Sequence, residues 1–195
     1  MGGTSRNNSE GIAVDASGNV YTTGYFNGIT DFDPGTGVFS LTGLGGYDNF
    51  VQKLDASGNF VWAGSMRSPR LSISSGIAVD ASGNVYTTGT FSDTVDFDPG
   101  PGIFNLTPSG HSDFFVSKLS PAPLGELELE SAARMGGTGN DQGHATAVDA
   151  SGNVYTTGSF EGTVDFDPGV GIFNLTSAGS RDIFVTKLDA DHNFL

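Results

Sequence analysis

The sequence contains no cysteine and few basic residues, and both shortages exclude whole classes of chemistry. Without cysteine the chain can form no disulfide and perform no thiol chemistry. Its 8 lysine and arginine residues stand against 22 aspartates and glutamates, which gives a formal net charge of −14 at pH 7. Such a surface repels nucleic-acid phosphates and anionic lipid. No apolar run approaches the roughly 18 residues of a membrane-spanning helix. We therefore expect neither a nucleic-acid partner nor membrane insertion.

Glycine, phenylalanine and internal repetition dominate the sequence that remains. The 195 residues include 30 glycines and 15 phenylalanines, a mixture typical of short strands joined by tight turns. The segment GIAVDASGNVYTTG at 11–24 recurs unchanged at 76–89, and AVDASGNVYTTG returns at 147–158. The segment DFDPG recurs at 31–35, 96–100 and 165–169. A period this long indicates an array of supersecondary units that stack on one another.

Within each repeat the pattern predicts four antiparallel strands. Apolar runs flank DASGN turns, in which glycine supplies a positive φ and Asp and Asn bond the local backbone. A DFDPG hairpin separates the second strand from the third. The segment GELELESAARM at 125–135 contains good helix formers, but Leu127 and Leu129 alternate with Glu, which predicts an outer strand. We predict an all-β fold, a β-propeller segment of three four-stranded blades at 1–66, 67–135 and 136–195.

The repeated residues AVDASGNVYTTG, DFDPG and DIFVTKLD resemble the bacterial β-propeller repeat family often called SBBP. The resemblance covers essentially the whole chain, three times over. It implies a β-propeller in a secreted or cell-surface protein, and we therefore expect an extracellular or cell-surface location. The family has no common catalytic activity, so the resemblance indicates a fold more strongly than a function.

The two ends of the sequence interrupt the repeat. MGGTSRN at 1–7 matches MGGTGND at 135–141, and the final NFL matches the start of a fourth strand at 59–61. We expect three blades to leave two apolar faces open, lined by Phe50, Phe115 and Phe184. A second copy could close a six-bladed ring, copies could stack into a filament, or further blades of the same polypeptide could complete the ring.

The DFD pairs are the candidate metal ligands. In a strand the two aspartates share one face, and the phenylalanine between them points into the core. Paired carboxylates beside a Pro-Gly turn suit Ca²⁺, and the alternative is a simple Asp-Pro-Gly turn with solvated acids. The candidate Ca²⁺ ligands are Asp31, Asp33, Asp96, Asp98, Asp165 and Asp167.

Three other repeated side chains have structural interpretations. One set of aspartates should accept hydrogen bonds within the DASGN turns: Asp15, Asp80 and Asp149. One set of lysines should be exposed or pair with Asp48, Asp113 and Asp182: Lys53, Lys118 and Lys187. One set of tyrosines should pack in the core, with a sugar-binding platform as the alternative: Tyr21, Tyr86 and Tyr155.

The sequence offers no catalytic constellation. His111, His144 and His192 occupy different places in the repeats and are expected to be exposed, and none lies in a triad or metal-ligand pattern. We therefore predict a non-catalytic extracellular structural or interaction module that assembles with itself or with further blades. The alternative is a ligand-binding propeller with one glycan or peptide site per blade.

Overall fold

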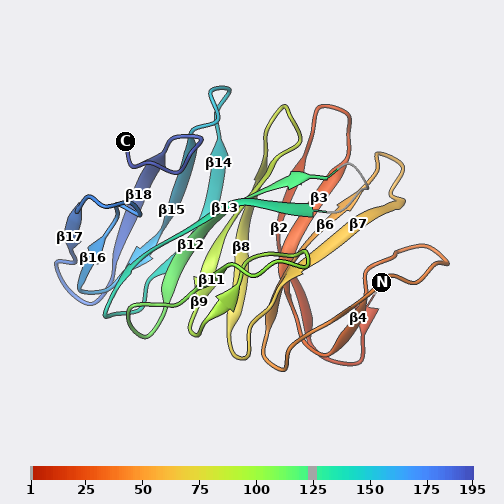
Figure 1. The fold of residues 1–195 in the computed structure, drawn as a ribbon, viewed down its shortest axis with the longest axis horizontal. Helices are drawn as coiled ribbons and strands as arrows, with labels where there is room; N and C mark the ends of the chain where they lie inside the picture. The colour runs from red at the N-terminus through yellow and green to blue at the C-terminus, as the bar shows by residue number, and fades with distance from the viewer. Residues whose placement is uncertain (1, 123–126) are drawn as a thin grey trace.

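The computed structural model describes residues 2–122 and 127–195, and it confirms the all-β prediction. Its 18 strands pair in antiparallel fashion, and the described residues contain no helix. Consequently, no helix in the described part of the chain could cross a membrane. The strands form a row of twisted sheets in chain order, with the two ends of the chain on opposite sides of the molecule (Figure 1).

Two of the repeats form four-stranded meanders, and the third forms three strands. Unit 1 has the order β2 (Asn7–Val14), β3 (Val20–Phe26), β6 (Asp48–Leu54) and β7 (Phe60–Met66). Unit 2 contains β8 (Ser72–Val79), β9 (Val85–Phe91), β12 (Asp113–Pro121) and β13 (Leu127–Gly137). Unit 3 contains β14 (Gln142–Val148), β15 (Val154–Phe160) and β18 (Asp182–Leu188).

The fourth strands agree with the pattern of the repeat. β13 is the outer strand predicted for 125–135, although Gly125 and Glu126 lie outside the described residues. In unit 3 a single bridge joins Leu188 to Phe194, at the place where Leu54 pairs with Phe60 in unit 1. The last residues of the sequence therefore occupy the start of a fourth strand.

The predicted DFDPG hairpins link one unit to the next. They comprise β4 (Ile29–Asp31) with β5 (Ser40–Thr42), β10 (Val95–Asp96) with β11 (Asn105–Leu106), and β16 (Thr163–Asp165) with β17 (Asn174–Thr176). The first strand of each hairpin also forms a second pairing. In units 2 and 3 its partners lie at the end of the outer strand of the preceding unit, and in unit 1 they are the matching residues at the start of the sequence. These partners are β1 (Gly2–Gly3) for β4, Arg67 for β10, and Gly136 and Gly137 for β16. The second and third hairpins thereby fasten their own units to the preceding ones, while the first pairs with β1 at the start of unit 1.

Much of the core lies between units. One cluster joins Tyr21, Val51 and Trp62 of unit 1 to Ile77 and other residues of unit 2. A second cluster joins Tyr86, Phe114 and Val116 of unit 2 to residues of unit 3 that include Phe184. The first strands approach closely because glycine stands at the contact: a Cβ on Gly76 would lie 2.8 Å from the Cα of Ala145. The units therefore share apolar faces instead of burying each face alone.

The prediction of open faces lined by Phe50, Phe115 and Phe184 is wrong for two of these residues. Phe115 and Phe184 are 0% and 4% exposed and pack between units, whereas Phe50, 4% exposed, lines a small pocket on the side of unit 1 that faces away from unit 2. Phe184 points towards unit 2, where its ring stacks on Phe114 with centroids 4.4 Å apart. Alternation along β18 then turns Ile183 and Val185 the other way, and these are 87% and 75% exposed.

Candidate functional site

The aspartates of the DFD pairs are hydrogen-bond acceptors within their own turns. Asp31 Oδ1 accepts from the backbone N–H of Asp33 at 3.0 Å and of Phe39 at 2.9 Å, and Asp33 Oδ1 accepts from that of Gly35 at 2.7 Å. The same three bonds recur in the second and third hairpins. The two backbone donors lower the pKa of Asp31. The Asp-Pro-Gly turn that the sequence indicated is therefore present in every repeat.

The phenylalanine of each DFD pair points into the core, as predicted. The side chains of Phe32, Phe97 and Phe166 are at most 2% exposed. The carboxylate of Asp33 is half-buried and packs against Gly37, where a Cβ would collide with Oδ2 of Asp33. Across the described residues, no three acids or histidines are grouped closely enough to hold a metal ion. Ca²⁺ binding at the six aspartates thus stays a prediction.

The DASGN aspartates accept hydrogen bonds as expected. Asp15 Oδ1 accepts from the backbone N–H groups of Ser17 and Asn19, while its Oδ2 accepts from the Asn19 amide at 2.8 Å and the Tyr21 hydroxyl at 3.0 Å. The bond from the Asn19 side chain is the largest cause that lowers the pKa of Asp15. Gly18 adopts a φ of 81°, which explains why glycine stands at this turn position.

The repeated tyrosines serve packing. Tyr21 and Tyr86 are each 1% exposed, whereas Tyr155 is half-buried. Burial, followed by the charge of Asp80, raises the pKa of Tyr86 to about 12. A tyrosine platform for sugar rings is therefore not accessible in units 1 and 2, which weakens the glycan alternative.

The predicted pairing of the repeated lysines with Asp48, Asp113 and Asp182 is wrong. Lys53 Nζ lies 4.9 Å from the ring centroid of Tyr21, the residue directly opposite on β3, and Lys187 takes the same position over Tyr155 at 5.4 Å. In the described part of the chain the three ion pairs use arginine instead. A lysine on β6 or β18 reaches the aromatic face across the ladder because cross-strand neighbours lie close together.

Three aspartates are fully buried at the ends of the units, and the sequence did not predict their burial. Asp48 accepts from the backbone N–H groups of Leu44 and Ser68. Asp113 pairs with Arg134 at 2.7 Å, and its Oδ1 has no partner. Asp141 accepts from the N–H groups of Gly137 and Glu161. Burial is the largest cause that raises the pKa of each of these carboxyls.

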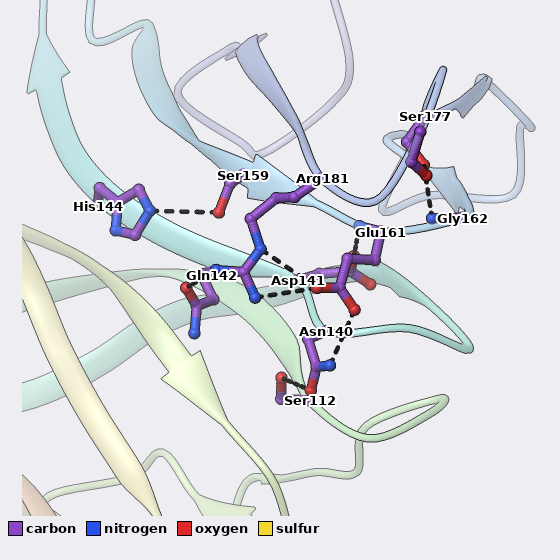
Figure 2. Close-up of polar contacts among 11 residues, drawn as sticks. Ser112, Asn140, Asp141, Gln142, His144, Ser159, Glu161, Gly162, Ser177 and Arg181 are labelled. Carbon is purple, nitrogen blue, oxygen red and sulfur yellow. Dashed lines mark hydrogen bonds and ion pairs between the residues drawn. The ribbon is translucent and has the colours of Figure 1, made fainter.

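A polar network surrounds Asp141 at one end of unit 3 (Figure 2). Arg181 donates to Glu161 at 3.0 Å and to Gln142 at 3.2 Å, and Asn140 donates to Glu161 at 2.9 Å. The corresponding positions in unit 1 hold Tyr47 for Arg181 and Asn27 for Glu161. A search for departures from the repeat would have found this network, which is specific to unit 3.

Each histidine side chain makes at most one polar contact with the described residues. His144 Nε2 lies 3.3 Å from Ser159 Oγ, and His111 Nδ1 lies 3.3 Å from the carbonyl oxygen of Thr138. No carboxylate of the described residues hydrogen-bonds to His144, so the contact with Ser159 lacks the third member of a triad. The predicted exposure holds for His111 and His144 and is wrong for His192, which is 6% exposed.

The two outward faces of the row carry exposed aliphatic side chains. Ile183 and Val185 form one face, on unit 3, and Ile12 and Val14 form the other, on unit 1, with exposed fractions of 69% and 58% for the latter pair. The equivalent residues between units are covered: Val51, which corresponds to Val185, is 0% exposed, and Ile77, which corresponds to Ile12, is 7% exposed. The same strand positions are therefore buried where two units meet and accessible where a unit has no neighbour in the described part of the chain.

The comparisons with known proteins support a repeat β-structure. No family model matches the chain, so the resemblance to the SBBP repeats stays a prediction. A similar protein is the uncharacterized WD repeat-containing protein L264 of Acanthamoeba polyphaga mimivirus, at 24% identity over 226 residues. The alignment covers the whole of this chain and 15% of the length of that relative. The similarity agrees with an all-β, propeller-like repeat and is too distant to assign the chain to a family.

Proposed function

We propose that the chain is a segment of a β-propeller, in which units 1 to 3 are blades, and that it acts as a non-catalytic structural and interaction module. Its binding surfaces are the two outward faces. The observation that carries the proposal is that the strand faces that pack between units also occur, uncovered, at both ends of the row. The uncovered residues are Ile12 and Val14 on unit 1, and Ile183 and Val185 on unit 3. The similarity to a WD repeat-containing protein supports a propeller architecture.

The size of the apolar contribution supports association. Full burial of an aliphatic side chain contributes about 1.5–3 kcal/mol, so the four exposed residues together contribute about 6–12 kcal/mol. Loss of translational and rotational freedom costs about 4–15 kcal/mol. The two terms are comparable, and we therefore expect association that depends on protein concentration and on the remaining complementarity of the faces.

The module closes a ring, extends as a filament or joins further blades of the same kind. An extracellular or cell-surface location belongs to the proposal and is supported by the resemblance to SBBP repeats. The native mass of the 195-residue chain, measured by light scattering over a range of concentrations and checked by electron microscopy, tests the proposal. A defined dimer or a filament supports it. A folded monomer at the highest concentration reached contradicts it.

A ligand-binding propeller is the second candidate. A pocket of about 300 Å³ between the turns of units 1 and 2 brings Tyr21 and Lys53 together with Asp15 and Asp80. It offers one ammonium group and a polar wall to a small ligand, even though the tyrosine ring is covered. Glycan and peptide arrays probed with the native chain and with Lys53→Met test this candidate. Binding that the variant loses would favour a ligand site, and no binding to either array would dismiss it.

A further inference from the structure

Phe114 is one of the unit 2 side chains that form the apolar contact between units 2 and 3. Phe114 projects from unit 2 and stacks on Phe184 of unit 3, with ring centroids 4.4 Å apart and planes inclined by 29°. Phe166, from the hairpin of unit 3, lies 5.9 Å from Phe114. Phe114 is 0% exposed. The phenylalanine therefore fills a receptor formed by two aromatic rings of the following unit.

The contact between units 1 and 2 uses the same position differently. Asn49 replaces Phe114 there, and its amide donates to the hydroxyl of Ser72 at 2.7 Å in a buried hydrogen bond. Unit 3 has Ile183 at this position, with 87% of its side chain exposed. The projecting residue thus differs at each unit, and the third one is an aliphatic group without a receptor in the described part of this chain.

Unit 1 carries the matching receptor on its outward face. A pocket of about 160 Å³ is lined there by residues that include Gly2, Asn7, Ser9, Thr30, Phe32 and Phe50. Phe32 and Phe50 correspond to Phe166 and Phe184, the two rings that receive Phe114 between units 2 and 3. We call this site the Phe50 pocket. Its size and aromatic walls suit one aliphatic side chain.

We infer that the partner of the outward faces is a second copy of this chain, whose Ile183 inserts into the Phe50 pocket. The inference rests on the proposed function and adds the partner and the residues that recognise it. The contact is heterologous, because Ile183 and the Phe50 pocket lie on different faces of one chain. Val185 beside Ile183 extends the apolar contact and takes the place that the buried Val116 occupies between units 2 and 3.

The first test changes Ile183 and compares native mass with that of the unchanged chain. Ile183→Asp places a charge at the centre of the contact, and we expect the apparent dissociation constant to rise roughly 30-fold or more, the loss typical of a central hot spot. Ile183→Phe copies Phe114 and should retain or tighten association. The matched control is Ile172→Asp, an equally drastic change at a 76% exposed hairpin residue that belongs to neither pair of face residues. It should associate as the unchanged chain does.

The second test uses two variants that are each defective on one face. Ser9→Phe fills the Phe50 pocket and leaves Ile183 intact, whereas Ile183→Asp leaves the pocket intact. Each variant alone should be monomeric, and an equimolar mixture should form a complex of two chains, because one working face of each kind remains. Circular dichroism and thermal melting establish that both variants fold; should Ser9→Phe fail to fold, the pair Ile183→Asp and Ile183→Phe decides the question.

The outcomes separate this inference from the proposed function. Association of the unchanged chain that Ile183→Asp leaves intact would overturn the role of Ile183 while the interaction module stands. A mixture of the two variants that stays monomeric would also contradict the heterologous contact. A folded chain that never associates would overturn both.

Discussion

His192 provides the sharpest test of the structure, because its ionisation and its backbone conformation are both unusual. It replaces a glycine of the DASGN turn and is the one non-glycine residue with positive φ, at 64°, in the described part of the chain. Both ring nitrogens are buried without a hydrogen-bond partner. Burial, followed by the charge of Lys118, lowers the pKa of His192 from 6.5 to about 4, against the opposing charges of Asp189 and Asp191.

The lowered pKa makes stability depend on pH in a defined direction. His192 takes up its proton near pH 6.5 in the unfolded chain but only near pH 4 in the folded chain. The free energy of unfolding is therefore highest above pH 6.5 and declines as the pH falls towards 4. The displacement of about 2.5 pH units corresponds to a loss of about 3 kcal/mol below pH 4. At pH 4.5 most of this loss, about 2–3 kcal/mol, should already have occurred.

The perturbation is His192→Gly, which restores the residue found at the equivalent turn position, Gly58. Urea unfolding of both proteins between pH 7.5 and pH 4.5 measures the difference in free energy of unfolding. The buried carboxyls of Asp48, Asp113 and Asp141 have raised pKa values and favour the folded state at low pH, but they are present in both proteins and cancel. We expect the variant to gain about 2–3 kcal/mol in free energy of unfolding relative to the unchanged protein as the pH falls across this range. A difference that does not change with pH would refute the burial of a neutral His192.

Three further predictions concern the core, the hairpins and Ca²⁺. Phe114→Ala should lower the free energy of unfolding by about 3–5 kcal/mol in urea titrations, more than the matched change Asn49→Ala at the polar contact, and equal losses would argue against the aromatic receptor. Gly37→Ala should destabilise the fold by about 1–3 kcal/mol in the same assay, because its Cβ would collide with the carboxylate of Asp33. Gly35→Ala should lower the free energy of unfolding by less, because the atom nearest to its Cβ would be 3.1 Å away. A larger loss for Gly35→Ala than for Gly37→Ala would contradict the hairpin geometry. Calorimetry with Ca²⁺ should show about one site per blade and a higher melting temperature, which the Asp→Asn variants of the DFD pairs abolish; no heat and no shift at millimolar Ca²⁺ would remove the Ca²⁺ proposal.

The repeat made local structure predictable. Each DASGN turn needs glycine at positive φ and aspartate as acceptor, so its hydrogen bonds depend on residues within six positions of one another. The same is true of the DFDPG hairpin, whose aspartates bond backbone groups two and eight residues away. The prediction that Phe32 points into the core is confirmed, although β4 ends at Asp31 and the DFD pair continues into the turn. Residue types that act over short distances in the chain can be interpreted without a tertiary structure.

Contacts between distant segments could not be predicted in the same way. Lys53 was expected to be exposed or to pair with an acid, but the residue opposite on the neighbouring strand is Tyr21, and only the register of β3 and β6 decides this. His192 resembles an exposed substitution in a polar turn, yet the packing of that turn buries it. The network of Arg181 and Glu161 joins residues 20 positions apart that do not recur in the other repeats.

The sequence by itself determined the strands, the turns and their repetition, because these follow from local backbone preferences and from a pattern written three times. Only the tertiary structure decided which side of each strand meets a neighbour. A one-residue step along β18 separates Phe184, buried against unit 2, from Ile183, which is open to a partner. Both residues are apolar, so hydrophobicity cannot distinguish them; the direction in which the units stack can.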